Sequence, residues 1–405
     1  MQRRSCRGRL VHRLPGKGVS APAPGRAPTR VPMIDLEAQY RSIRSEIEAA
    51  VAPVVASQRF VLGPVVEECE AAVAAYAGRR FGIGVSSGTD ALLVALMAEG
   101  IGAGDEVITT CFSFFATAGA MVRLGATPVF ADIDAKTFNI DAHAVERLVT
   151  KRTRAIVPVH LYGQMADMRA ILETARRHDL VVVEDAAQAL GGSRDGARAG
   201  SVGHYGCFSF YPTKNLGGFG DGGMVVTGNH DRASRVRELR AHGEGAGYIH
   251  RVVGGNFRLD ALQAAVVNAK LPHLDDWNRA RRRNASLYNE LLGDFATRHP
   301  DLLELPANRA ERHTFHQYVA KIARRDEVRA ELAQAGVETG VYYPLPLHLQ
   351  ECFRSLGHNK GDFPAAERAA ECVLALPVHS ELGQEQVVHV ADTLLGVLSR
   401  QSRTR

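Results

Sequence analysis

The sequence predicts an α/β protein with a large, mostly parallel sheet and a smaller C-terminal α/β domain. Between residues 81 and 184, short apolar segments alternate with segments of helical periodicity. Such alternation is typical of βαβ units, whose crossovers join parallel strands. The segment 180–183 is apolar at every position, as expected for a strand that is covered on both faces.

The expected strands and helices of the first domain alternate along the chain. Strands are expected at 81–85, 106–110, 127–132, 155–159 and 180–184. Helices are expected between them at 86–100, 116–124, 142–150 and 168–178. The first of these helices is apolar on nearly all sides, which predicts a buried position. Ser87, with Asp90 three residues later, resembles a capping box at its start.

The pattern changes after Gly255. Helices are expected at 259–274, 277–292 and 325–335, and a strand at 317–322. We therefore expect a large domain over residues 31–275 and a small C-terminal domain over residues 276–405.

Residues 1–30 form a basic tail that is expected to be disordered. They contain eight Arg and Lys residues, four prolines and no acidic residue, a composition that cannot bury enough apolar surface to order itself. An overextended translation start is an equivalent interpretation, and a secretory signal is disfavoured because no apolar core is present. The remaining residues carry a net charge of −3, so nucleic acid binding is not expected.

Two further classes are disfavoured by composition. The sequence contains no apolar run of eighteen residues, so no membrane span is expected. Its six cysteines include no C-x-x-C pair, which favours a reduced, cytoplasmic setting and no metal site.

Lys214 is the first candidate catalytic residue. It lies between Pro212 and the glycine-rich segment 217–223, which allows close approach of the backbone. A lysine amine held in a cleft can form a Schiff base with a carbonyl compound, as pyridoxal 5′-phosphate (PLP) requires. The alternative is an ordinary surface lysine.

Asp185 is the candidate partner of that cofactor's ring nitrogen. It ends the strand expected at 180–184, and ligands of open α/β sheets bind beyond the carboxyl ends of the strands. Gln188, three residues later, could reach the phenolic oxygen on the same edge of the ring. The alternative for Asp185 is a cap of the following turn.

A phosphate site is expected where the helix at 86–100 begins. Backbone N–H groups at a helix N-terminus attract phosphate, and Gly88 and Thr89 lie there. Ser209, five residues before Lys214, could add a hydroxyl. An ordinary helix cap is the alternative.

An aromatic face is expected after the strand at 106–110. A flat cofactor ring needs an apolar surface on which to lie. Phe114 is the stacking candidate, and the neighbouring Phe112 and Phe115 are expected in the core.

Four motifs together resemble the DegT/DnrJ/StrS aminotransferases. They are Ser-Gly-Thr-Asp-Ala at 87–91, Glu-Asp-Ala-Ala-Gln at 184–188, Ser-Phe-Tyr-Pro-Thr-Lys-Asn-Leu-Gly at 209–217 and Gly-Asp-Gly-Gly at 220–223. The resemblance implies an aspartate-aminotransferase-like fold (PLP fold type I), a homodimer with shared active sites, and PLP as cofactor. It also implies transfer of an amino group from an amino acid, L-glutamate above all, to a nucleotide-linked keto sugar.

The resemblance assigns four more site residues. Asn256 matches an asparagine that reaches the partner subunit's cofactor phosphate. Arg258 matches an arginine that lies near the sugar. Tyr343 and His348 belong to an aromatic-proline segment close to the substrate. This chain has Tyr342 where relatives often have His, which leaves the sugar contacts of the segment open.

The resemblance leaves the reaction's details open. The segment 242–250 is more similar to members that aminate carbon 3 of the hexose than to those that act at carbon 4. Members that act as sugar dehydratases carry His in place of the lysine, so Lys214 favours transamination. A regulatory protein that keeps the fold without catalysis is the remaining alternative.

Overall fold

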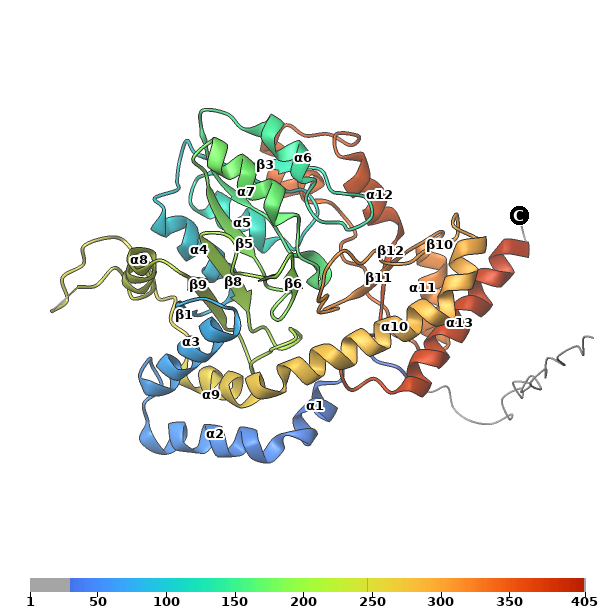
Figure 1. The fold of residues 1–405 in the computed structure, drawn as a ribbon, viewed down its shortest axis with the longest axis horizontal. Coiled ribbons are helices and arrows are strands. Elements are labelled where there is room, and N and C mark those ends of the chain that lie inside the picture. Colours follow the sequence, from blue (N-terminus) through green and yellow to red (C-terminus); the bar gives the residue numbers. More distant parts are fainter. Residues whose placement is uncertain (1–29, 246, 404–405) are drawn as a thin grey trace, which may run out of the picture.

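The computed structural model describes residues 30–245 and 247–403. Its centre is a seven-stranded sheet (Figure 1) with the strand order β1-β9-β8-β5-β4-β2-β3. The strands are β1 (Phe81–Val85), β2 (Glu106–Thr110), β3 (Thr127–Ala131), β4 (Thr153–Val157), β5 (Val181–Asp185), β8 (Tyr205–Ser209) and β9 (Gly223–Thr227). β9 is antiparallel to both β1 and β8, while the pairings from β8 to β3 are parallel. The predicted mostly parallel α/β sheet is therefore confirmed.

Alternate residues of the strands enter two different cores. Ile108 and Val182 belong to one core, and their neighbours Val107 and Val183 belong to the other. Successive side chains of a strand point to opposite faces, so an uninterrupted apolar strand requires cover on both sides. Helices α2 (Arg44–Ser57), α3 (Pro64–Tyr76), α7 (Met168–Arg177) and α9 (Ala261–Lys270) cover the first face, and α4 (Gly88–Ala98), α5 (Ala116–Arg123) and α8 (His230–Arg240) the second.

Helix α4 begins with the predicted cap. Ser87 Oγ accepts a hydrogen bond from the N–H of Asp90 at 3.0 Å and donates one to the Asp90 carboxylate at the same distance. Ser86 Oγ donates to that carboxylate at 2.7 Å. Residues 91–96 are buried on every side of the helix, as its sequence predicts.

A second unit is built around three antiparallel strands, β10 (Leu303–Glu304), β11 (Tyr318–Ile322) and β12 (Val373–Leu376). It is packed by α10 (Leu274–Arg298), α11 (Arg325–Gln334) and α13 (Gln384–Arg403). Figure 1 shows α10 running from the side of the large sheet to the small unit, where it lies along α13. Trp277 packs in a small cluster with Ile43, Ile47 and Val266, whereas Tyr288 lies in the core of the second unit. The predicted boundary near residue 275 falls in the first turn of α10.

The N-terminal segment connects the two units. Arg30 forms an ion pair with Glu338 at 2.8 Å, and Val31 bridges Val337. The chain then passes through α1 (Leu36–Ser42) to α2, which packs on α9. The basic tail expected at 1–30 lies outside the described residues apart from Arg30.

The remaining elements are short. They are α6 (Ala142–Val145), η1 (Glu146–Leu148), η2 (Leu161–Gly163), β6 (Ser193–Arg194), β7 (Ala197–Arg198), η3 (Leu271–His273), η4 (Leu347–Leu349), η5 (Glu351–Leu356) and α12 (Pro364–Cys372). The helix expected at 142–150 is thus a single α-helical turn followed by a 3₁₀ turn. Within residues 30–245 and 247–403, no helix combines the length and apolarity needed to cross a bilayer.

Candidate active site

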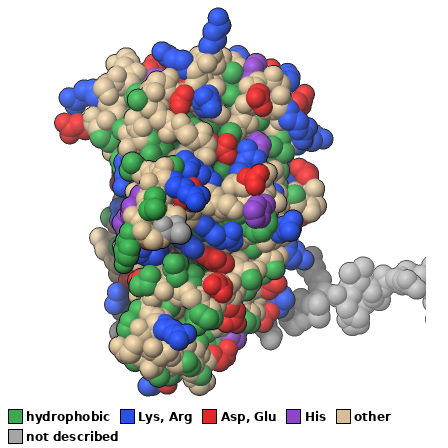
Figure 2. All heavy atoms as spheres, turned by 90° about the vertical axis from the view of Figure 1, so that its left-hand side faces the viewer, with side chains coloured by type: hydrophobic (Ala, Val, Ile, Leu, Met, Phe, Trp, Pro, Cys, Tyr) green, Lys and Arg blue, Asp and Glu red, His purple; other side chains and the backbone are tan. Residues whose placement is uncertain are grey.

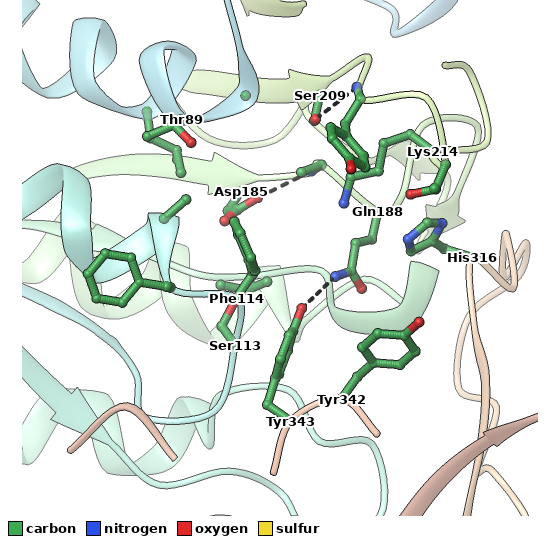
Figure 3. Close-up of a pocket in the computed structure, with 18 of the residues that line it drawn as sticks. Thr89, Ser113, Phe114, Asp185, Gln188, Ser209, Lys214, His316, Tyr342 and Tyr343 are labelled. Atoms are coloured by element: carbon green, nitrogen blue, oxygen red, sulfur yellow. Dashed lines mark hydrogen bonds between the residues drawn. The ribbon is translucent and has the colours of Figure 1, made fainter. Parts of the chain in front are cut away.

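A cavity of about 720 Å³ opens where the parallel strands end (Figure 3). The last residues of β5 and β8, Asp185 and Ser209, lie in its wall. The segments that follow β2 and β4 contribute Ser113 and Val159. A loop from the small unit, carrying Tyr343, closes the opposite side. The carboxyl edge of a parallel sheet brings together residues far apart in sequence, and it is the usual ligand site of open α/β folds.

Lys214 lies in the loop that connects β8 to β9 and points into the cavity. Its backbone N–H donates to the Tyr211 carbonyl at 2.8 Å, which forms a turn. Burial lowers the pKa of Lys214 to about 8, although the nearby Asp185 carboxylate opposes the shift. About a tenth of the amine is therefore unprotonated at pH 7, so Lys214 can act as a nucleophile and as a proton carrier.

The loop around Lys214 is fixed by a second buried lysine. Lys270 of α9 donates from Nζ to the Gly217 carbonyl at 2.9 Å, and its ammonium lies 5.1 Å from the ring centroid of Phe219. Burial lowers the pKa of Lys270 to about 8. Gly217 has no room for a side chain, because a Cβ there would meet the Pro212 backbone. Glycine at this position therefore allows the backbone to pack closely against Pro212.

Asp185 is the last residue of β5 and is almost fully buried. Its carboxylate accepts a hydrogen bond from Thr117 Oγ1 at 2.7 Å and one from the Ala187 N–H at 3.2 Å. These two contacts fix the orientation of the carboxylate at the cavity wall. The carboxylate can therefore receive a protonated ring nitrogen.

The residue before Asp185 forms a buried pair that the sequence did not reveal. Glu184 Oε2 lies 2.8 Å from His160 Nε2, and neither side chain is exposed. His160 Nδ1 accepts from the Ala166 N–H, so its proton lies on Nε2 and is donated to Glu184. Burial opposes ionisation, but hydrogen bonds from His160 and from the backbone keep the pKa of Glu184 below its ordinary value. The pair stabilises the end of β5 through this buried hydrogen bond.

The start of α4 borders the cavity, as the predicted phosphate site requires. Gly88 and Thr89 line it, and Ser87 caps only the N–H of Asp90. The first N–H groups of a helix lack acceptors within the helix and carry partial positive charge, which suits a phosphate. Ser209 lies against Gly88, where a Cβ would come within 2.6 Å of the Ser209 Cβ. Packing against Ser209, which the sequence did not show, is thus a further reason for this glycine.

Three neighbouring phenylalanines have different environments. Phe112 is fully buried, as predicted. Phe114 is 56% exposed and lines the cavity, with its ring 6.4 Å from that of Tyr343. The expectation that Phe115 lies in the core is wrong, because it is 47% exposed, lines the cavity and stacks on Phe353. The chain turns into α5 here, so consecutive side chains no longer alternate between core and surface.

Gln188 connects the sheet edge to the loop of the small unit. Its Oε1 accepts from the Tyr162 N–H at 2.6 Å, and its Nε2 donates to the Tyr343 hydroxyl at 3.3 Å (Figure 3). The Tyr162 hydroxyl in turn donates to the Tyr342 carbonyl. Burial raises the pKa of Tyr343, so its phenol stays protonated.

His348 lies outside the wall of the cavity. Its side chain is buried, its Nε2 lies 3.1 Å from the Glu367 carboxylate, and its ring packs on Phe363. The neighbours Leu347 and Gln350 line the cavity instead. Leu347 and His348 are consecutive residues of the 3₁₀ turn η4, so their side chains point to different sides.

Asn256 and Arg258 border a separate hollow on the outer side of the α4 start. This hollow shares Ser87 and Asp221 with the main cavity. Because Asn256 does not line the main cavity of its own chain, its contact with a partner subunit's cofactor stays a prediction.

The residues present fit PLP. A lysine with a lowered pKa, a buried carboxylate, a helix start and an exposed aromatic ring surround one cavity. The described part of the chain has no group of three His, Cys, Asp or Glu side chains placed to hold a metal ion.

Comparisons with known proteins identify the family of this chain. The family model of the DegT/DnrJ/EryC1/StrS aminotransferases matches residues 41–395. A protein of Geobacillus stearothermophilus named pleiotropic regulatory protein is 50% identical over 365 residues, which cover 90% of this chain and 97% of that protein. The UDP-N-acetyl-3-dehydro-alpha-D-glucosamine 3-aminotransferase of Acidithiobacillus ferrooxidans is 43% identical over 366 residues, which cover 90% of this chain and 97% of that protein.

A solved structure shows the same fold. The crystal structure of S. venezuelae DesV in complex with a ketimine intermediate superposes with a TM-score of 0.88 at 42% sequence identity. The match covers 92% of this chain and 99% of that chain. The predicted resemblance and fold are thereby confirmed, and the chain belongs to the DegT/DnrJ/EryC1/StrS aminotransferase family.

Proposed function

We propose that this chain is a PLP-dependent aminotransferase that transfers an amino group from L-glutamate to carbon 3 of a nucleotide-linked keto sugar. The observation that carries the proposal is the placement of Lys214, with a pKa of about 8, in one cavity with the buried Asp185 carboxylate. An aminotransferase of this kind needs an amine that reacts near neutral pH and an acid that keeps a pyridine ring charged.

Each part of the cofactor has a matching residue. Asp185 would hold the ring nitrogen, Phe114 would cover one face of the ring, and Ser209 with the start of α4 would bind the phosphate. When bound, PLP supplies an electron sink for the charge that develops beside the migrating amino group.

Lys214 would carry the proton. An amine with a pKa of about 8 can both remove and return a proton near neutral pH, which is the behaviour expected of a general acid–base group. Asp185, held by Thr117, would maintain the negative charge that faces the ring nitrogen. Tyr343 and Gln188 close the cavity on the side of the small unit and reduce the access of water.

Carbon 3 is favoured by two observations. The segment 242–250 resembles that of carbon-3 enzymes, and the relative from Acidithiobacillus ferrooxidans is named as a 3-aminotransferase.

A homodimer is favoured by the protruding segment that precedes Asn256. Tyr248 is 87% and Val253 is 90% exposed there, and Figure 2 shows hydrophobic side chains on this side of the molecule. Large exposed hydrophobic residues are typical of a protein interface.

The proposal is tested by incubating the protein with PLP, L-glutamate and a panel of nucleotide-linked 3-keto and 4-keto sugars. Mass spectrometry would show an amino sugar only from the 3-keto substrates, together with 2-oxoglutarate. Lys214→Ala is the negative control, and the exposed Lys360→Ala is its matched control.

The other outcomes separate the alternatives. Amination of 4-keto sugars alone would contradict the carbon-3 assignment. Loss of a hydroxyl without gain of nitrogen would indicate a dehydratase. If no glutamate is consumed and no cofactor is bound, the chain is a regulatory protein of this fold.

A further inference from the structure

His316 lies in the wall of the cavity beside Lys214 (Figure 3). It precedes β11 and is partly exposed to the cavity. The sequence pattern gave no sign of this histidine, because it is close to Lys214 only in the folded chain.

A chain of side-chain amides fixes the tautomer of His316. Asn278 Nδ2 donates to the Leu190 carbonyl at 3.1 Å, so its Oδ1 is the atom that faces Asn215. Asn215 Nδ2 donates to that Oδ1 at 2.6 Å and to the Thr314 carbonyl at 3.1 Å. The remaining amide atom of Asn215 is its oxygen, which lies 3.0 Å from His316 Nδ1. An amide oxygen only accepts, so Nδ1 carries the proton and Nε2 carries the lone pair.

The imidazole stays neutral in this position. Burial, followed by the positive charges of Lys214 and Arg281, holds the pKa of His316 well below its ordinary value. Arg281 is held at this segment because it donates to the carbonyl oxygens of Phe315 and His316 at 3.2 and 3.3 Å. His316 therefore presents an acceptor that does not readily take a proton.

The Lys214 and His316 side chains line one cavity without a hydrogen bond between them in this structure. We propose that His316 positions Lys214 by accepting a hydrogen bond at Nε2 when the flexible Lys214 side chain brings its amine to the ring. This inference rests on the proposed function, in which the Lys214 amine is the reacting group. The charged groups that act on this pair are Asp185 at the end of β5 and Arg281 of α10. Asp185 attracts the ammonium, whereas a neutral imidazole directs the amine without competing for its proton.

The test uses covalent attachment of PLP to apoprotein, which needs no sugar substrate. The absorbance change that accompanies attachment is followed by rapid mixing across the pH range around the Lys214 pKa of about 8. His316→Phe removes the acceptor, and His316→Gln keeps one. His313→Phe is the control, because His313 is a buried histidine of the same segment that does not line the cavity.

Loss of an acceptor destabilises the ammonium, so His316→Phe is expected to lower the apparent pKa of the reacting amine by about half a unit to one unit. It is also expected to slow attachment about tenfold at high pH, where orientation alone limits the rate. His316→Gln should stay within about twofold of wild type. His313→Phe should leave the apparent pKa unchanged.

Two results would overturn the inference. One is a His316→Phe variant whose attachment rate and apparent pKa equal those of the wild type. The other is the same unchanged attachment with a raised KM for the nucleotide sugar, which would assign the imidazole to the substrate. Failure of the wild-type protein to attach PLP at all would instead refute the proposed function.

Discussion

The hydroxyl of Thr117 donates a hydrogen bond to the Asp185 carboxylate at 2.7 Å and thereby joins the first turn of α5 to the end of β5. Both residues are buried. The contact leaves the carboxylate little freedom to rotate, so the direction of its charge is set before any ligand binds.

Thr117→Val keeps the shape of the side chain and removes its donor. We expect the glutamate half-reaction to slow about tenfold, because Asp185 loses a hydrogen bond that orients it. The rate is measured by single-turnover kinetics with PLP-loaded protein. Thr109→Val is the control, since the buried Thr109 hydroxyl donates to the Val157 carbonyl instead. Equal losses in both variants would show that Thr117 acts only through stability.

Lys214→Met is expected to stabilise the apoprotein near pH 7 while abolishing turnover. The folded pKa of about 8 lies below the ordinary value of 10.5, so burial of the ammonium destabilises the fold below pH 8. Between these two values the unfolded chain binds more protons, and wild-type stability therefore rises with pH. The advantage of the variant, about 1–2 kcal/mol after allowance for solvent contact, should shrink above pH 8. Denaturant unfolding at several pH values measures the difference in free energy of unfolding between the variant and the wild type. A difference that grows with pH would contradict the prediction.

Lys270→Met should loosen the loop that carries Lys214. The variant loses the hydrogen bond to the Gly217 carbonyl and leaves that buried oxygen without this donor, which costs about 1–3 kcal/mol. We expect faster hydrogen exchange over residues 215–222 and weaker PLP binding. The exposed Lys360→Met serves as control. Unchanged exchange in the loop would show that its glycine packing is sufficient.

Glu184→Gln should destabilise the protein by about 2–4 kcal/mol at neutral pH. The glutamine would place an amide donor against the donors that now face the carboxylate, namely His160 and the N–H groups of Gly200, Val202 and Gly203. Because the folded pKa of Glu184 is lowered, its contribution is present above the ordinary value of 4.5 and is lost as the pH falls through the folded pKa.

The difference in unfolding temperature between the wild type and Glu184→Gln should therefore become smaller as the pH falls. The exposed Glu173→Gln is the matched control and should follow the wild type at every pH. A gap that stays constant down to the lowest pH would contradict the assignment of a charged Glu184.

The sequence predicted the parts of the molecule that depend on local pattern. β5 could be located because residues 180–183 are all apolar, and Asp185 and Lys214 lie in short motifs with distinctive chemistry. β8 and β9 were missed because Gly206 and Gly223 weaken a strand pattern. A Cβ at Gly206 would meet the Gly200 backbone, and such a close approach is determined by the tertiary fold.

Residues that act through distant partners could not be predicted. Thr117 and Asp185 are 68 positions apart, and Asn215 and His316 are 101 apart. No short-range pattern marks such pairs. Phe115 and His348 show a second difficulty. Where the chain turns, a residue next to a cavity-lining position can face either the cavity or the protein interior, and the sequence does not show which.

The pairing of Ser209 with Gly223 across β8 and β9 closes the loop that carries Lys214. A Cβ at Gly223 would meet the Ser87 carbonyl at the start of α4. The helix start, the strand end and the lysine loop thus share one backbone junction that has no space for a side chain. A substitution there would shift all three together, whereas the loop of Tyr342 and Tyr343 comes from the other unit and meets the sheet edge through hydrogen bonds with Tyr162 and Gln188. In the proposed function, the lysine therefore lies on a backbone junction that admits no side chain, whereas the facing side of the cavity is built by a separate unit.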